Sequence, residues 1–347
     1  MSFVIPALIA FLATVLAIFP TIKIAKKFNL LDHPQKRPHP AHIQNRVVPR
    51  AGGLAIFFGL ISSILLFISP SPPIIGIIFG LLILLIVGLL DDRYPHLSPY
   101  LRLVSQFMAA FFVVSQGVDI KFITNPLGGI INFSPLFASI LALLWIVWVM
   151  NMINWSKGVD GQMPGITTMA AIILGLLSIK LNFLGDPSQA DIAKLSFITA
   201  ASSLGLLIFN WYPAKIFPGF SGSTILGFMI AVLAILSGAK LATAGLVLLI
   251  PATDFAYTFF RRVLQGKSPV WGDQGHLHHK LLQIGLSHSQ ISLFYILGSA
   301  ILGAVALSLN SRGKLFAALL LATLILGGIL WLNFFGALSK RRAPDSG

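Results

Sequence analysis

Long apolar stretches, each about as long as a bilayer is thick, dominate this chain of 347 residues. A helix needs about 20 mostly apolar residues to cross the hydrocarbon core of a membrane. Because unpaired backbone groups are costly in lipid, such stretches predict transmembrane helices. Eleven of them are present, at residues 3–22, 51–69, 73–90, 101–118, 135–153, 165–183, 192–209, 223–239, 241–259, 290–309 and 315–335. The predicted fold class is therefore an all-α polytopic membrane protein, with residues 1–347 forming a single domain.

Composition excludes several classes of function. Only 10% of the residues are charged and 56% are hydrophobic, whereas a soluble domain carries about a quarter charged residues. A soluble enzyme, a disordered chain and a basic nucleic-acid-binding protein are thereby excluded. The chain has no Cys, so disulfides, thiolate metal sites and cysteine nucleophiles are absent. All ten acidic residues are Asp, so a site built on carboxylates has few candidates.

The distribution of basic residues predicts the orientation in the membrane. With the N-terminus outside, the cytoplasmic loops and the C-terminal tail carry 18 of the 24 Lys and Arg residues. Basic residues favour the cytoplasmic side, so we predict a multi-pass cell-membrane protein with a cytoplasmic C-terminus. Apolar and polar residues alternate over 121–133, around the turn sequence Pro126-Leu127-Gly128-Gly129. This pattern predicts a small external β-hairpin.

Two adjacent carboxylates end one of the apolar stretches. Asp91 and Asp92 follow the last leucines of that stretch and precede Arg93. Ionisable groups at this depth are costly and usually functional. The pair could hold Mg²⁺, which binds through one or two carboxylates and substrate phosphates, or one Asp could act as a base. An ion pair with Arg93 at the helix end is the alternative without a function.

Two further predicted cytoplasmic loops combine glycine with cations or hydroxyl groups. Arg50 precedes Gly52-Gly53 and could bind a phosphate, although a topology signal is the simpler explanation of a basic loop. Residues 219–223 read Gly-Phe-Ser-Gly-Ser at the start of a helix, which suits an anion. Ser223 as a plain N-cap explains that segment equally well.

The loop at 151–165 is rich in amides and glycine. Asn151 and Asn154 stand at helical spacing, and Lys157 and Asp160 follow them. Amide and carboxylate side chains suit the recognition of a base or a ribose. An ordinary turn between helices rarely needs this many amides, so the loop is a candidate binding site.

Three of the eight His residues lie within four positions, at His276, His278 and His279. Zn²⁺ is one interpretation, but carboxylate and thiolate partners are sparse here and the flanks are basic. Phosphate binding by imidazole and ammonium groups fits better, with Lys267 nearby upstream.

The order of these loops resembles the polyprenyl-phosphate N-acetylhexosamine-1-phosphate transferase superfamily of the bacterial cell envelope. The resemblance covers almost the whole chain. It is closer to the branch that uses UDP-N-acetylglucosamine than to the branch that uses the peptidoglycan pentapeptide precursor. The matching residues are Asp32, Pro34, Pro49-Arg50-Ala51-Gly52-Gly53, Asp91-Asp92-Arg93, Asn151, Asn154, Gly158-Val159-Asp160-Gly161, Ala214-Lys215-Ile216-Phe217, Asp254, Gly266-Lys267-Ser268-Pro269, Asp273 and His276-Leu277-His278-His279-Lys280.

The resemblance implies a reaction at the cytoplasmic face. A polyprenyl phosphate attacks the β-phosphorus of a UDP-N-acetylhexosamine, which gives polyprenyl-diphospho-sugar and UMP for cell-envelope glycans such as lipopolysaccharide or teichoic acid. The resemblance also implies a Mg²⁺ cofactor and a homodimer. Its implied catalytic residues are Asp91, Asp92 and Asp160, with Asp91 and Asp92 also as metal ligands. The implied nucleotide-sugar ligands are Asn151, Asn154, Lys157, Asp160 and Lys215, and the implied phosphate ligands are Arg50, Lys267, His276, His278 and His279.

Two positions depart from the family pattern. The family has an Asp where this chain has Lys157, and its magnesium ligand where this chain has Phe220. A phenyl ring cannot coordinate a hard cation, which requires oxygen ligands. The magnesium site is therefore rebuilt from Asp91, Asp92 and Asp160, weakened or absent. The two changes make the site more positive by three charges, so we hypothesise that Lys157 takes over part of the electrostatic role of the metal.

Two alternative functions stay open at this point. A relative that has lost catalysis would still bind lipid phosphate or nucleotide sugar, although drift alone would not spare Asp91, Asp92 and the His cluster. A transporter would place ionisable groups near the bilayer midplane. Nearly every Asp here lies in a loop or at the end of a stretch, with Asp254 the closest exception.

Overall fold

The computed structural model describes residues 3–33, 46–94, 97–125, 128–238, 240–268 and 275–342, with the side chains of 333 and 335–342 left out. The motif residues Pro34, Pro269 and Asp273 lie outside these ranges. The helices are α1 (Val4–Lys27), α2 (Gly52–Phe67), α3 (Pro72–Arg93), α4 (Pro99–Ser115), α5 (Pro135–Trp155), α6 (Gln162–Phe183), α7 (Gln189–Asn210), α8 (Gly219–Leu236), α9 (Leu241–Val247), α10 (Leu249–Leu264), α11 (Leu277–Gln283), α12 (His288–Ser308) and α13 (Ser311–Arg342). The strands are β1 (Leu31–Asp32), β2 (Val48–Pro49), β3 (Phe122–Thr124) and β4 (Ile130–Asn132).

Each predicted apolar stretch falls on a helix, which confirms the all-α polytopic class. Among the described residues, eight helices are long and apolar enough to cross a membrane, and α2 and α4 are shorter apolar helices. The stretch at 241–259 differs from the prediction, because it forms two helices, α9 and α10, bent by 83°. Pro251 lies in the first turn of α10 and has no N–H to continue the hydrogen bonds of α9, which explains the break.

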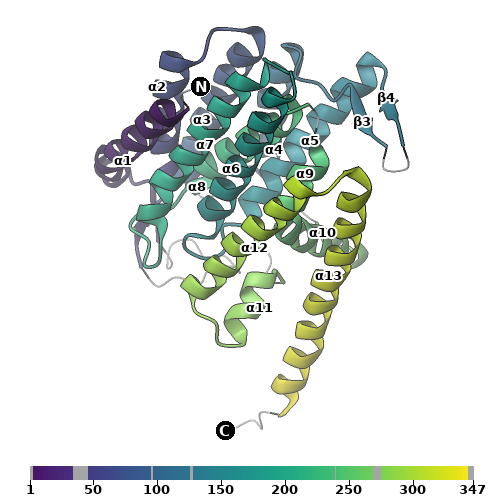
Figure 1. The fold of residues 1–347 in the computed structure, drawn as a ribbon. Helices are drawn as coiled ribbons and strands as arrows, with labels where there is room; N and C mark the ends of the chain where they lie inside the picture. The colour runs from purple at the N-terminus through teal and green to yellow at the C-terminus, as the bar shows by residue number, and fades with distance from the viewer. Residues whose placement is uncertain are drawn as a thin grey trace.

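The helix α8 is the central element of the bundle. Of its 18 residues, 94% are buried inside the protein. None of its side chains is charged. A helix that is apolar all round belongs in the interior of a large bundle, and α2, α3 and α5 pack against it. By contrast, only 6% of the residues in the most apolar 18-residue stretch of α13 are buried. This helix stands at the edge of the bundle (Figure 1).

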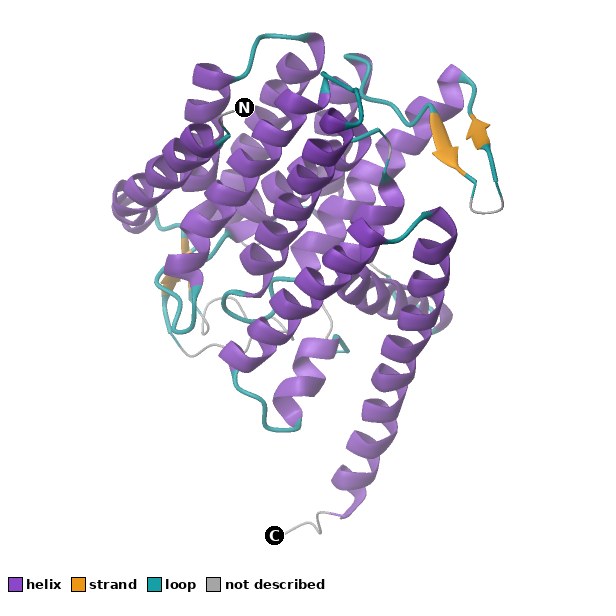
Figure 2. Ribbon diagram, in the orientation of Figure 1, coloured by secondary structure: helices purple, strands orange, loops and turns teal. Residues whose placement is uncertain are grey.

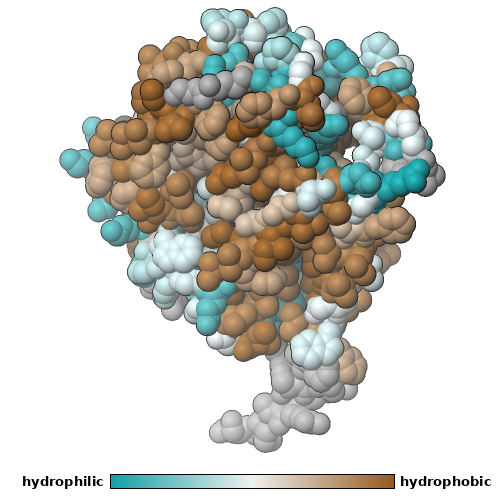
Figure 3. Space-filling model, in the orientation of Figure 1, coloured by the Kyte–Doolittle hydropathy of each residue, from teal (hydrophilic) through white to brown (hydrophobic). Residues whose placement is uncertain are grey.

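Apolar side chains cover much of the outer surface, as a lipid-facing protein requires. Large exposed hydrophobic residues occur along several helices, for example Leu65, Phe111, Ile301 and Leu320. Figure 3 shows hydrophobic surface, in brown, across the middle of one face, with hydrophilic residues toward its upper edge. In water such a surface would drive association, so the finding supports a multi-pass membrane protein.

The two short sheets lie at opposite ends of the bundle (Figure 2). The predicted hairpin at 121–133 is confirmed, because β3 and β4 pair antiparallel with Phe122 opposite Asn132. The N-terminus lies at the same end as this hairpin (Figure 1). At the other end, β1 pairs with β2, with Leu31 opposite Pro49, and α11 lies there as well. The polar loops singled out in the sequence gather at this second end.

Two glycines let neighbouring helices approach the first turn of α8. A Cβ atom on Gly53 of α2 would collide with the backbone of Gly222, and one on Gly88 of α3 would collide with the backbone of Ser221. These contacts bring the ends of α2 and α3 against the beginning of the central helix. The carboxylates that end α3 are thereby held at the N-terminus of α8.

Candidate functional site

Asp92 is fully buried at the N-terminus of α8. Its Oδ1 accepts the backbone N–H of Phe220 at 2.8 Å, and its Oδ2 accepts the hydroxyl of Ser221 at 2.8 Å. Carboxylates are favourable at helix N-termini because the first N–H groups lack partners in the helix. Gly219 has a φ of +71°, and a Cβ there would collide with the Asp92 carboxylate. Asp92 therefore fixes the turn with which the central helix begins.

Asp91, the neighbouring carboxylate, pairs with a cation from the next helix. Its Oδ1 lies 2.5 Å from Nε of Arg102 in α4. The guanidinium of Arg102 also lies 5.7 Å from the centre of the Phe220 ring, which is within the range of cation–π attraction. Asp91 and Phe220 thus hold Arg102 from two sides. Phe220 is itself 3% exposed.

Lys157 enters the same cluster from the loop between α5 and α6. Its Nζ donates to Oδ1 of Asn154 at 2.7 Å and lies 3.4 Å from the carbonyl oxygen of Gly219. The hydroxyl of Ser223 donates to the same Asn154 oxygen at 2.8 Å. Burial, together with the neighbouring Arg50, lowers the pKa of Lys157 to about 8, although Asp92 acts in the opposite direction. Lys157 therefore carries its charge at neutral pH.

Arg50 links the two-stranded sheet of β1 and β2 to the carboxylates. Its Nε lies 3.6 Å from Oδ1 of Asp92, and its Nη1 lies 3.4 Å from Oδ1 of Asp32. Burial acts against the charge of Arg50, but the carboxylates of Asp92, Asp32 and Asp91 outweigh it and raise the pKa of the guanidinium. We call Asp32, Asp91, Asp92, Arg50, Arg102 and Lys157 the charge cluster.

Asp160 does not join the charge cluster. Its Oδ2 accepts the backbone N–H of Ala214 at 2.9 Å and lies 3.7 Å from Nη2 of Arg46. Next to it, Gly161 has a φ of +81° and donates its N–H to Oδ1 of Asn210 at 3.0 Å. These bonds tie the α5–α6 loop to the α7–α8 loop. Asp160 is placed as an anchor of the loop, apart from Asp91 and Asp92.

The histidines form a second cluster, anchored by Asp254 of α10. Nδ1 of His276 lies 2.9 Å from Oδ2 of Asp254, whose Oδ1 accepts the backbone N–H of Leu277 at 2.7 Å. The rings of His276 and His278 are stacked at 5.5 Å, and those of His278 and His279 lie 4.4 Å apart. Among the described residues, the buried Nδ1 of His278 has no hydrogen-bond partner. That nitrogen can bind a ligand.

One short loop separates the charge cluster from the histidines. Lys157 in this loop belongs to the charge cluster and is held by Asn154 at the end of α5. The ring of His278 packs so closely on Gly158 that a Cβ there would collide with its Nε2, and Trp155 lies 5.4 Å from the ring of His276. Because the loop touches both groups, anionic groups bound at the two clusters would lie on its two sides.

Three other sequence-predicted ligands lie outside these clusters. Asn151 is engaged between helices, because its Nδ2 donates to Oε1 of Gln106 at 2.7 Å. Lys215 and Lys267 are both exposed in loops. Lys215 follows Ala214, whose backbone N–H donates to Asp160. Lys267 follows α10, and its backbone N–H donates to the carbonyl oxygen of Arg262 at 2.9 Å.

The residues present do not fit a magnesium ion. No group of three or more acidic or histidine side chains in the described part of the chain could hold a metal. Three of the four carboxylate oxygens of Asp91 and Asp92 already accept donors from the protein. Phe220 offers no oxygen, and Asp160 lies elsewhere. The predicted metal site at Asp91 and Asp92 is therefore occupied by the cations of the protein itself.

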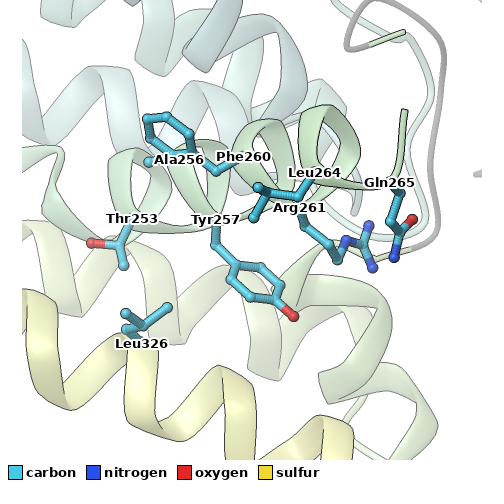
Figure 4. A pocket seen from close by; sticks show the side chains of 8 residues that line it. All are labelled: Thr253, Ala256, Tyr257, Phe260, Arg261, Leu264, Gln265 and Leu326. Carbon is cyan, nitrogen blue, oxygen red and sulfur yellow. The ribbon is translucent and has the colours of Figure 1, made fainter. Parts of the chain in front are cut away.

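An apolar pocket of about 470 Å³ opens between α10 and α13. Figure 4 shows Tyr257, Phe260 and Leu264 of α10 lining it, with Leu326 of α13 opposite and Arg261 toward one end. Tyr257 and Arg261 follow Asp254 by three and seven residues, so they lie on the same side of α10 as Asp254. The helix α10 thus both lines the pocket and, through Asp254, anchors the histidine cluster.

Burial predicts a pH-dependent stability at His278. Burial and the neighbouring His276, His279 and His288 hold the pKa of His278 well below 6.5. In acid the unfolded chain takes up this proton first, so stability is complete above about pH 6.5 and falls below it, by up to about 1.4 kcal/mol per pH unit. Thermal unfolding in detergent between pH 5 and 8 should show a shallower acid loss for His278→Gln than for wild type. The same slope in both proteins would contradict the assignment, and His33→Gln is the matched control.

Sequence reasoning missed Arg102 and Ser221 as parts of the site. Arg102 counts only as a loop cation in the charge pattern, although a lone charge at the start of an apolar stretch signals function. Ser221 lies in the Gly-Phe-Ser-Gly-Ser segment, but its partner Asp92 is 129 residues away. No local pattern could pair them.

Comparison with known proteins identifies the family. The sequence profile of glycosyl transferase family 4 matches residues 74–238. A probable undecaprenyl-phosphate N-acetylglucosaminyl 1-phosphate transferase of Bacillus subtilis is 34% identical, over 85% of this chain and 82% of its own. A decaprenyl-phosphate N-acetylglucosaminephosphotransferase of Mycolicibacterium smegmatis is 31% identical, over 87% and 81%.

A more distant relative shows the same relationship. The undecaprenyl-phosphate alpha-N-acetylglucosaminyl 1-phosphate transferase of Escherichia coli K12 is 26% identical, over 85% of this chain and 80% of its own. The profile match includes Asp91, Asp92, Arg102 and Lys157, and each of the three relatives matches at least 85% of this chain. The chain therefore belongs to glycosyl transferase family 4.

Proposed function

We propose that this protein transfers N-acetylglucosamine 1-phosphate from UDP-N-acetylglucosamine to a polyprenyl phosphate, as one integral-membrane domain. The relatives are named for this transfer. In this chain the charge cluster and the histidine cluster lie at one end of the bundle, where the reaction could take place. The observation that carries the proposal is the α5–α6 loop. It supplies Lys157 to the charge cluster and contacts the histidine cluster through Gly158. The reaction brings two phosphate-bearing substrates together.

The chemistry requires positioning and charge neutralisation more than covalent help from the protein. An oxygen of the polyprenyl phosphate forms a bond to the β-phosphorus of the nucleotide sugar. The bond from that phosphorus to the bridging oxygen breaks, and UMP leaves with the electron pair. With a dianionic acceptor phosphate no proton is transferred. Arg50, Arg102 and Lys157 would bind the diphosphate of the donor, and the histidines would bind the acceptor phosphate.

The pocket between α10 and α13 supports a lipid acceptor. Its lining is apolar apart from Arg261 and neighbouring polar groups at the ends, which suits an isoprenoid chain with an anionic head. Arg261 lies over the Tyr257 ring at 5.7 Å, and Lys280 beside the histidines lies over the same ring at 5.0 Å. A chain in the pocket would thus place its phosphate toward the histidine cluster.

Release of UMP tests the proposed function. Purified protein in detergent is incubated with undecaprenyl phosphate and a panel of UDP-sugars, both with Mg²⁺ and with chelator. We expect UMP and a lipid-linked sugar diphosphate from UDP-N-acetylglucosamine. A thermal-unfolding measurement establishes that the purified protein is folded. If such protein releases no UMP with any sugar under either condition, catalysis is refuted and a binding role is left.

The proposed orientation places the two clusters on the cytoplasmic side. The chain has no Cys, so single-cysteine variants can be labelled without background. Thr124 lies in the hairpin at one end and Gln283 in α11 at the other, and both are exposed. In intact cells a membrane-impermeant maleimide should label Thr124→Cys and spare Gln283→Cys, while permeabilised cells should show both. The reverse pattern would overturn the orientation.

A further inference from the structure

The charge cluster contains as many fixed cations as carboxylates. Arg50 lies between Asp32 and Asp92, and Arg102 pairs with Asp91. Lys157 is close enough for both Asp91 and Asp92 to raise its pKa. The six side chains therefore sum to no net charge at neutral pH. A divalent cation is held by oxygen ligands that carry an excess of negative charge. This cluster has no such excess.

The substitutions at 157 and 220 create that balance together. With Asp at both positions, the same cluster would carry three net negative charges, which suits a divalent cation. Lys157 supplies the charge, while Phe220 removes a competing carboxylate and packs against the guanidinium of Arg102. Each change alone would leave the cluster unbalanced, so the two are parts of one arrangement.

The ammonium of Lys157 is positioned for a ligand. Lys has three donors, and the oxygens of Asn154 and Gly219 account for two of them. Within the described part of the chain, the third donor has no hydrogen-bond acceptor. Asn154 is in turn held by Ser223 in the first turn of α8, so the ammonium is oriented against the helix N-terminus, where anions are favoured.

We propose that Lys157, with Arg102 and Arg50, binds the diphosphate of the nucleotide sugar directly, so that this protein works without a divalent cation. The inference rests on the proposed function for the identity of the ligand. A diphosphate carries about the charge that two such cations can neutralise, and Arg matches phosphate oxygens with two parallel donors. During transfer the same groups would stabilise the negative charge on the departing UMP.

Metal binding tests this inference without relying on activity. Mn²⁺ is titrated into purified wild type and into the double variant Lys157→Asp with Phe220→Asp, and free Mn²⁺ is followed by electron paramagnetic resonance. We expect no saturable site in wild type up to about 1 mM, the weak end of protein sites with oxygen ligands, and a saturable site in the double variant. A wild-type site that disappears in Asp91→Asn would overturn the inference. If the double variant does not fold, the test uses Lys157→Gln, which adds no negatively charged metal ligand. This variant is compared with wild type in the ligand titration described next.

Ligand binding provides the second readout. Calorimetric titration of UDP-N-acetylglucosamine should give the same Kd, within about twofold, in Mg²⁺ and in chelator. Lys157→Gln should weaken that Kd at least about tenfold, the loss of one charge-assisted contact, whereas Lys194→Gln at the other end of the bundle should not change it. Binding that requires Mg²⁺, or that ignores Lys157→Gln, would overturn the inference.

The two proposals fail in different ways. UMP release that occurs only with Mg²⁺ would leave the transferase function standing and overturn the metal-free site. Absence of UMP release together with chelator-resistant, Lys157-dependent binding would refute transfer and support the cation cluster as a diphosphate site.

Discussion

Replacing Lys157 by Met should lower kcat/KM for transfer by about 10²- to 10³-fold, the usual effect of removing one fixed group that stabilises transition-state charge. Met keeps the unbranched apolar part of the side chain and removes the ammonium that Asn154 and Gly219 orient. The cluster then carries one uncompensated carboxylate, which repels the diphosphate. Release of UMP by purified variant and wild type, in matched amounts of folded protein, measures the effect.

The pattern of substitutions at 157 separates charge from structure. Lys157→Arg keeps the charge and should recover a large part of the activity lost in Lys157→Met. Lys121→Met, at an exposed lysine of the hairpin on the other end of the bundle, should retain wild-type activity. If Lys157→Met stays within about threefold of wild type, well short of the loss of a charge-stabilising group, Lys157 has no role in charge neutralisation.

Replacing Asp92 by Ala should destabilise the protein by about 3–5 kcal/mol, because a buried charged partner is left uncompensated. The carboxylate is fully buried and holds Arg50, the N–H of Phe220 and the hydroxyl of Ser221. Its loss removes the cap of the central helix. Chemical or thermal unfolding in detergent, followed by circular dichroism, should show a large decrease in the unfolding midpoint.

Two variants make the result at Asp92 interpretable. Asp92→Asn keeps an oxygen for the Phe220 N–H but loses the charge and turns the second acceptor oxygen into an NH₂ donor. It should therefore fold and be intermediate in stability. Asp191→Ala removes an ion pair with Lys194 in which both side chains are partly exposed. Such a pair contributes about 0–1 kcal/mol, so that variant should unfold close to wild type. An Asp92→Ala variant as stable as Asp191→Ala would show that Asp92 is not structural.

The fold was largely predictable because the bilayer imposes a length on each helix. The apolar stretches locate all the long helices, and Pro at the first turns of α3, α4 and α5 marks their starts. The break between α9 and α10 was not predicted, since hydropathy counts apolar residues and does not sense the missing donor of Pro251. The hairpin at 121–133 followed from local alternation and turn residues alone.

The sequence predicted many of the residues of the site, but not which residues they contact. Asp91, Lys157 and His278 stand out in the sequence because polar groups are rare in this chain. Their partners are set by helix packing, which brings Asp92 to residues 128 and 129 positions away. Asp160 shows the limit most clearly, since its sequence position suggests a place beside the acidic pair, and the structure instead uses it to hold Ala214. Arg102 enters the site only because α4 packs against α3.

The ratio of UMP release in chelator to UMP release in Mg²⁺ tests the central claim most directly. Wild-type protein with UDP-N-acetylglucosamine and undecaprenyl phosphate should give a ratio near one, because Arg50, Arg102 and Lys157 supply the positive charge. The double variant Lys157→Asp with Phe220→Asp, assayed alongside, should turn over only with Mg²⁺. A wild-type rate that vanishes in chelator and returns with added Mg²⁺ would contradict the account.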